Sequence, residues 1–121
     1  MQQSDLKERT MRFALDVTTL CRRVQPEWPQ RRVADQVFRS ATSVAANYRA
    51  ASRARSRREF MAKLGLVAEE AEETVFWLEF ALRAGMTDQR SAGLMQESRE
   101  LLAIFIASLK TISGNLKQPR T

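Results

Sequence analysis

Arginine is concentrated in one short stretch of the chain, residues 49–58. A planar guanidinium group matches the oxygens of a phosphate, and a dense group of such side chains is typical of proteins that bind nucleic acid. The candidate nucleic-acid-binding residues are Arg49, Arg53, Arg55, Arg57 and Arg58. The alternative is a solvated helix end, at which some of these arginines pair with Glu59, Glu69 or Glu72. Since no recognition helix or aromatic stacking platform is evident, we expect contacts to the phosphate backbone and not to the base sequence.

A second group of chemically active side chains is acidic. It consists of Glu69, Glu70, Glu72 and Glu73. Carboxylates on helices can form di-iron sites, but those sites pair glutamate with histidine, and this sequence contains no histidine. We therefore predict no metal and no cofactor, and we expect Glu70 and Glu73 to form salt bridges within the chain or across a subunit interface.

Catalytic chemistry has little support in the sequence. Without histidine, imidazole bases, imidazole ligands and helical ribonucleases that depend on an arginine and a histidine are excluded. Cys21 is the single cysteine, and it has no base to activate it, although Arg22 and Arg23 follow it. We expect Cys21 to be a buried or half-buried core residue. No glycine-rich phosphate loop is present either, so we predict a protein that is not an enzyme.

Length and composition indicate one soluble domain. The chain has 121 residues, 44% hydrophobic residues and 28% charged residues, which is enough for one sizeable core over residues 1–121. The formal net charge is +6. The longest apolar run, residues 101–107, is far shorter than the roughly 20 residues that span a bilayer, and no signal-peptide core follows the polar residues 1–5. We expect a cytoplasmic protein without a membrane partner.

The hydrophobic periodicity predicts four helices and no strands. Their expected ranges are residues 5–25, 31–54, 57–84 and 88–113. Ser4 is the expected N-cap of the first helix, and Ser56 with Glu59 forms a capping-box pattern before the third. Gly85 and Gly114 are expected at helix ends, and prolines at positions 26 and 29 interrupt the chain between the first two helices. Short connections favour an all-α, antiparallel up-down-up-down four-helix bundle.

Each predicted helix carries one apolar stripe, which should form the core. The stripes are Leu6, Phe13, Val17, Leu20 and Val24; Val33, Val37, Ala41, Val44 and Tyr48; Phe60, Leu64, Val67, Ala71, Val75, Leu78 and Leu82; and Leu94, Ser98, Leu101, Phe105, Leu109 and Ile112.

The last two predicted helices carry further apolar residues outside these stripes. The candidate oligomer-interface residues are Leu66, Phe76, Trp77, Phe80, Met95, Leu102 and Ile106. A subunit exposing so many apolar side chains needs a partner to cover them, and a tryptophan in such a place suits an interface anchor. The alternative is that the helices are rotated and these residues widen a single core.

Three segments carry a family resemblance, which covers most of the chain. They are RSATSVAANY at residues 39–48, SRREFMAKL at residues 56–64 and EEAEETVFWL at residues 69–78. In type and spacing they resemble the four-helix bundle family named after 23S rRNA intervening-sequence proteins. The resemblance implies an up-and-down bundle that assembles as a ring-like homopentamer. The family is also similar to accessory proteins of diversity-generating retroelements, which are basic pentamers that bind a reverse transcriptase and nucleic acid.

The residues that match the family pattern have structural interpretations. The matching positions are Arg39, Ser43, Asn47, Glu70 and Glu73. Asn47 could bond backbone groups where the chain turns, and Ser43 could hydrogen-bond back into its own helix. The chain departs from the pattern at Ala50, near which many relatives carry glutamate, so the local charge is more positive here.

Together these features predict a non-enzymatic homo-oligomer, with five subunits as the expected number. It would bind RNA or DNA, or a nucleic-acid enzyme such as a reverse transcriptase, through the arginine surface. The alternative is a protein–protein scaffold or adaptor that has no role with nucleic acid. It would use the candidate oligomer-interface residues of the last two predicted helices and the glutamates of residues 69–73.

Overall fold

The computed structural model describes residues 3–117, and it confirms an all-α protein with four long helices. Helix α1 spans Gln3–Arg22, α2 Gln30–Ala51, α3 Arg57–Arg83 and α4 Ala92–Lys117. A short 3₁₀ turn, η1, covers Gln89–Ser91 and leads into α4. No strand occurs within the described residues.

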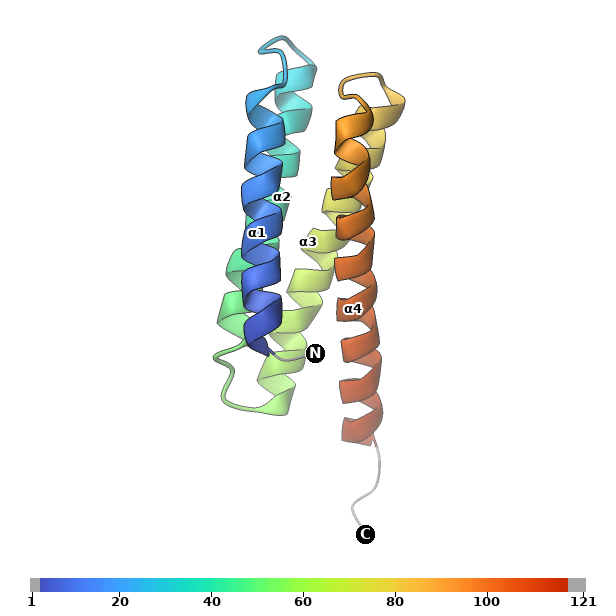
Figure 1. Ribbon diagram of the computed structural model, residues 1–121. Coiled ribbons are helices and arrows are strands. Elements are labelled where there is room, and N and C mark those ends of the chain that lie inside the picture. The colour runs from blue at the N-terminus through green and yellow to red at the C-terminus, as the bar shows by residue number, and fades with distance from the viewer. Residues whose placement is uncertain (1–2, 118–121) are drawn as a thin grey trace.

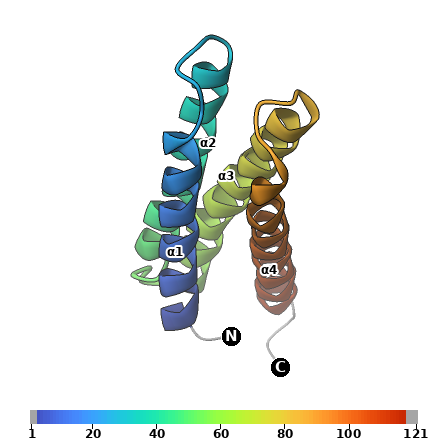
Figure 2. The same cartoon turned by 45° about the horizontal axis from the view of Figure 1, so that its top comes forward.

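The four helices lie side by side (Figure 1). The α1–α2 and α3–α4 connections lie at one end, and the α2–α3 connection lies at the other end, near the start of α1. Helix α3 packs between α2 and α4, while α1 packs mainly on α2 and touches α4 only lightly. In Figure 2 the α1–α2 pair and the α3–α4 pair diverge toward the end that holds the α1–α2 and α3–α4 connections.

One ion pair joins α1 and α4, which touch only lightly. The guanidinium of Arg9 donates to both carboxylate oxygens of Glu97, at 2.8 Å from Nε and 2.7 Å from Nη2. A further bond of 3.2 Å reaches Glu100. Such a two-pronged arginine–carboxylate pair is directional, so it fixes the register of α1 against α4.

Local sequence signals set two of the helix boundaries as predicted. Ser56 caps α3 by accepting a hydrogen bond of 3.1 Å from the backbone N–H of Glu59. Gly85 follows α3 with a φ of 73°, a left-handed conformation that glycine adopts without a steric penalty.

Other predicted boundaries are wrong by a few residues. Helix α1 begins at Gln3, so Ser4 lies inside it, and the helix ends at Arg22 instead of residue 25. Helix α2 stops at Ala51, and α4 continues through Gly114. A single glycine costs a helix only about 1 kcal/mol relative to alanine, which does not force an end.

The core follows the predicted stripes most closely on α2, where all five predicted residues are buried. Tyr48 of α2 stacks on Phe105 of α4 with 5.9 Å between the ring centroids. The structure also buries polar side chains that the apolar pattern did not include, among them Thr10, Ser40 and Thr74. Leu20 and Val75, placed in the predicted stripes, are only partly buried.

Candidate nucleic-acid interface

The predicted arginine residues gather around the α2–α3 connection, at one end of the bundle (Figure 1). Arg49 lies in the last turn of α2, Arg53 and Arg55 lie in the connection, and Arg57 and Arg58 open α3. All five side chains are exposed. We call these five residues the arginine loop.

The backbone that carries the arginine loop is held by a chain of hydrogen bonds. The N–H groups of Ser52, Arg53 and Ala54 donate to carbonyls of the last turn of α2, at 2.9, 3.1 and 3.0 Å. The N–H of Arg55 donates to the Glu59 carboxylate at 3.2 Å. The connection is therefore a fixed support from which the arginines project into solvent.

The charge of the arginine loop is not compensated within the chain. Across residues 3–117, none of its five guanidinium groups forms an ion pair. Glu59 is one of the acids considered as a partner. Its carboxylate Oε1 instead lies 3.8 Å from Nζ of Lys63. Glu69 and Glu72 are exposed on α3 and pair with no arginine of the described chain. The pairing of these arginines with Glu59, Glu69 or Glu72 is therefore not formed, while the alternative of a solvated helix end stays open.

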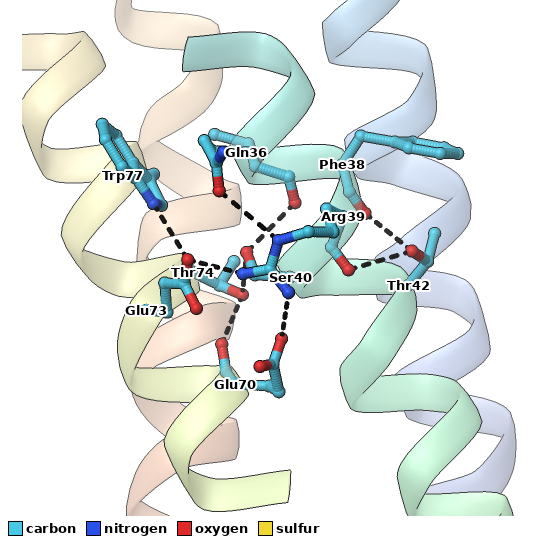
Figure 3. Close-up of polar contacts among 10 residues, drawn as sticks. Gln36, Phe38, Arg39, Ser40, Thr42, Glu70, Glu73, Thr74 and Trp77 are labelled. Atoms are coloured by element: carbon cyan, nitrogen blue, oxygen red, sulfur yellow. Dashed lines mark hydrogen bonds and ion pairs between the residues drawn. The ribbon is translucent and has the colours of Figure 1, made fainter. Parts of the chain in front are cut away.

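A second cluster of predicted residues joins α2 to α3 (Figure 3). Arg39 of α2 donates to Glu70 at 3.1 Å and pairs with Glu73, both on α3. The indole N–H of Trp77 donates to the same Glu73 carboxylate at 3.3 Å. The hydrogen bond and charge of Arg39 lower the pKa of Glu73. The predicted salt bridges of Glu70 and Glu73 thus form within the chain and hold two helices together.

Ser43 and Asn47, the other two residues of the family pattern, lie half-buried further along α2. Within the described residues neither side chain forms a hydrogen bond. Their neighbour Thr42 bonds back into the helix instead, by donating to the Phe38 carbonyl at 2.8 Å. The backbone bonds expected of Ser43 and Asn47 are therefore not formed within the described residues.

The predicted interface residues divide into exposed and buried sets. Leu66, Phe76 and Phe80 on α3 are 53%, 53% and 42% exposed, and Ile106 on α4 is also exposed. Trp77 and Leu102 are half-buried against the core.

Met95 was predicted to lie at the oligomer interface, but the structure places it in the core. It is only 6% exposed and belongs to the core of the chain. Met95 precedes the buried Ser98 by three residues, so both side chains lie on the same inward face of α4.

The exposed aromatic side chains of α3 contact one another. Phe76 meets Trp77 edge to face with 5.0 Å between centroids, and it stacks on Phe80 at 6.3 Å. A second exposed apolar group, absent from the sequence prediction, lies on α1 and α2 and comprises Met11, Leu15 and Phe38. We call Phe76, Trp77 and Phe80 the α3 apolar face, and we call Met11, Leu15 and Phe38 the α1–α2 apolar face.

Cys21 has the environment of a structural thiol. It is half-buried on α1, and its thiol donates to the Ala34 carbonyl at 3.5 Å. Burial, together with the negative charge of Asp35, raises the pKa of Cys21 to about 11. The thiol is therefore protonated and weakly nucleophilic near neutral pH.

Two further features bear on the kind of protein this is. Within the described residues, no group of three or more cysteine, aspartate or glutamate side chains could hold a metal ion. None of the helices there is long and apolar enough to cross a membrane.

Comparison with known families decides the identity of the fold. The family model described as 23S rRNA-intervening sequence protein matches residues 2–107. The chain belongs to this family. A crystal structure of a protein of unknown function from the S23 ribosomal protein family, from Bacteroides thetaiotaomicron VPI-5482, has 30% identity and a TM-score of 0.77. The match covers 86% of this chain and 97% of that one. No curated protein is similar enough to count as a relative.

In this member of the 23S rRNA-intervening sequence family, both clusters described above lie inside the matched region. The match includes the arginine loop, the Arg39 cluster and most of α4. The three segments on which the resemblance was based therefore identified the family correctly.

Proposed function

We propose that this protein is a non-enzymatic homo-oligomer that binds the phosphate backbone of nucleic acid through the arginine loop. The observation that carries the proposal is the uncompensated charge of this loop. Five exposed guanidinium groups project from a hydrogen-bonded connection, and none pairs with a carboxylate of the described chain. Unpaired cations held close together repel one another, and phosphates relieve this repulsion when they displace counterions.

The expected mode of binding is electrostatic. Guanidinium groups at the tip of a bundle can contact successive phosphates without reading base edges. An acidic face of a nucleic-acid enzyme, such as a reverse transcriptase, would be attracted by the same charge. Nucleic acid is the better-supported ligand, because its phosphates match the guanidinium fork in both charge and shape.

Assembly into a ring, with five subunits as the proposed number, is the second part of the proposal. The proposed subunit is an up-down-up-down bundle, which the positions of its connections support (Figure 1). A ring of more than two subunits needs two different faces on each subunit, since its contacts are head to tail. This chain exposes two apolar faces, one on α3 and one on α1 and α2. A ring would also place several arginine loops at one rim and strengthen the local field.

The binding site is tested by reversing charge in the arginine loop. The Arg49→Glu plus Arg53→Glu variant should lose binding to generic duplex RNA and DNA, measured by fluorescence anisotropy across a salt series. Each phosphate contact contributes roughly 0.7 to 0.9 to the slope of log affinity against log salt concentration, so the slope should also fall. The matched control is Arg83→Glu plus Lys110→Glu, which changes the charge equally at exposed positions outside the loop. Equal binding by the two variants would contradict the assignment of the site.

The oligomer is tested separately through the α3 apolar face. Phe76→Glu plus Phe80→Glu should shift the molar mass, measured by light scattering after size exclusion, toward the monomer. The Arg49→Glu plus Arg53→Glu variant should keep the wild-type mass, since the arginine loop lies outside both apolar faces. A wild-type protein that is itself monomeric would refute the assembly.

The exposed α3 apolar face also favours a second candidate function, a protein–protein scaffold without nucleic acid. In that case the arginines would serve solubility alone. The ratio of absorbance at 260 nm to that at 280 nm for the purified protein separates the two candidates, because a nucleic-acid binder co-purifies with its ligand.

A further inference from the structure

Trp28 lies in the connection between α1 and α2, at the end of the bundle opposite the arginine loop (Figure 1). Its side chain is 83% exposed, the highest value among the large apolar side chains of the described residues. It makes no ring contact within that part of the chain. An indole exposed in this way offers both faces of its ring to a ligand.

The backbone around Trp28 is held in one conformation. Pro26 and Pro29 restrict φ on either side of it. The N–H of Arg31 donates to the Glu27 carbonyl at 2.8 Å, and the N–H of Val33 donates to the Pro29 carbonyl at 3.1 Å. Because the support is already ordered, a ligand that binds the indole pays little conformational entropy.

The surroundings of Trp28 are cationic. Arg22, Arg23, Arg31 and Arg32 flank the connection, all are exposed, and none forms an ion pair within residues 3–117. The acids nearest in sequence, Glu27 and Asp35, leave a net charge of +2 over residues 22–35. Positive charge beside an exposed aromatic ring complements a ligand that carries both phosphates and flat rings.

Two open depressions lie beside this connection. One, of about 270 Å³, is lined by Pro26 and Arg31 together with Phe38. The other, of about 420 Å³, is lined by Arg23 and Gln30. The Gln30 side-chain oxygen is buried and accepts no hydrogen bond within the described chain. The same depression is lined by Asp88, so the positive charge beside the connection comes from the flanking arginines and is partly offset there.

We propose that Trp28 is a stacking platform for an unpaired base of a single-stranded nucleic acid, with the flanking arginines holding its phosphates. The proposal rests on the proposed function and deepens it, because it names single-stranded nucleic acid as a ligand class and adds a second site. The 22 residues of α2 separate this site from the arginine loop. At about 1.5 Å per residue the separation is roughly 33 Å, so short ligands can test the two sites independently. The structure thus supplies the aromatic platform that was not evident in the sequence.

The test uses the fluorescence of Trp28 in a Trp77→Phe background, which leaves Trp28 as the one tryptophan. A short single-stranded oligonucleotide should quench this fluorescence, and an abasic oligomer with the same number of phosphates should not. In anisotropy measurements, Trp28→Ala should weaken single-strand binding roughly 5- to 150-fold, as expected for one stacked base. Trp28→Phe, which keeps a ring, should retain most of the affinity. Binding of a blunt duplex should be the same in all three proteins.

The contrary outcomes are distinct from failure of the proposed function. Unchanged single-strand affinity in Trp28→Ala, or equal quenching by the abasic oligomer, would overturn the stacking site while the arginine loop could still bind duplex. A change in molar mass caused by Trp28→Ala would instead make Trp28 a subunit contact and would also overturn the proposal. Conversely, quenching that persists in Arg49→Glu plus Arg53→Glu supports a separate site, even if the arginine loop fails its own test.

Discussion

Thr74 of α3 donates a hydrogen bond of 2.8 Å to the hydroxyl oxygen of Ser40 on α2, and both side chains are completely buried. The Ser40 hydroxyl in turn donates to the Val37 carbonyl at 3.3 Å. A polar link inside the core thus joins α2 and α3, the two helices that meet at the arginine loop. The exposed Arg39 cluster joins the same two helices from outside, so their relative position is held on both sides.

The buried link leads to a prediction about stability. Ser40→Ala should destabilise the protein by about 0.5 to 1.5 kcal/mol, because the bond between the helices is lost while Thr74 keeps its hydrogen bond of 2.8 Å to the Glu70 carbonyl. The double variant Ser40→Ala plus Thr74→Val removes both hydroxyls and should be less destabilised than the sum of the two single variants. Urea denaturation at one fixed protein concentration measures this coupling. Additive effects would show that the hydrogen bond has no net role.

The lowered pKa of Glu73 predicts a loss of stability in acid. Because this carboxylate binds a proton less readily in the folded chain than in the unfolded chain, its contribution is fully present above its ordinary pKa of 4.5. The contribution disappears as the pH falls through the lower pKa of the folded state. Glu73→Gln should therefore show a shallower fall in urea midpoint between about pH 5 and pH 3. The comparison variant is Glu72→Gln, at an exposed position without an ion pair in the described chain.

Two glycines should respond to alanine with opposite signs. Gly85 has a φ of 73°, and alanine there should cost about 1 to 2 kcal/mol, since Cβ disfavours the left-handed conformation. Gly65 lies inside α3, and a Cβ added there meets nothing within 4 Å. Gly65→Ala should stabilise the protein by about 0.5 to 1 kcal/mol through better helix propensity. Thermal unfolding midpoints, lowered in one variant and raised in the other, check both predictions.

The raised pKa of Cys21 predicts slow thiol chemistry. A change from 9.0 to about 11 lowers the thiolate fraction near neutral pH, by roughly 100-fold. A soluble thiol reagent at about pH 8, below the ordinary thiol pKa, should react with the native protein far more slowly than with protein unfolded in urea. Asp35→Asn, which removes the repelling negative charge, should speed the native reaction. Equal rates in native and unfolded protein would contradict the half-buried, protonated thiol.

Several properties were determined by the sequence itself, because they depend on residues close together in the chain. Four helices and no strands followed from apolar periodicity, and the capping of α3 by Ser56 followed from a motif of four residues. All five residues of the predicted α2 stripe are buried, since their spacing of three and four residues follows the helical period. The family followed from three local segments, and the match over residues 2–107 confirms it.

The tertiary structure decided which faces meet and what remains exposed. Met95 and Thr74 are buried because α3 and α4 turn those faces toward their neighbours, a rotation that periodicity within one helix does not specify. The pairing of Arg39 with Glu73 needs two helices at a particular register. The exposure of Trp28 depends on how its connection leaves the bundle. Composition shows which side chains are available, but burial and pairing depend on contacts between distant residues, and those exist only in the packed chain.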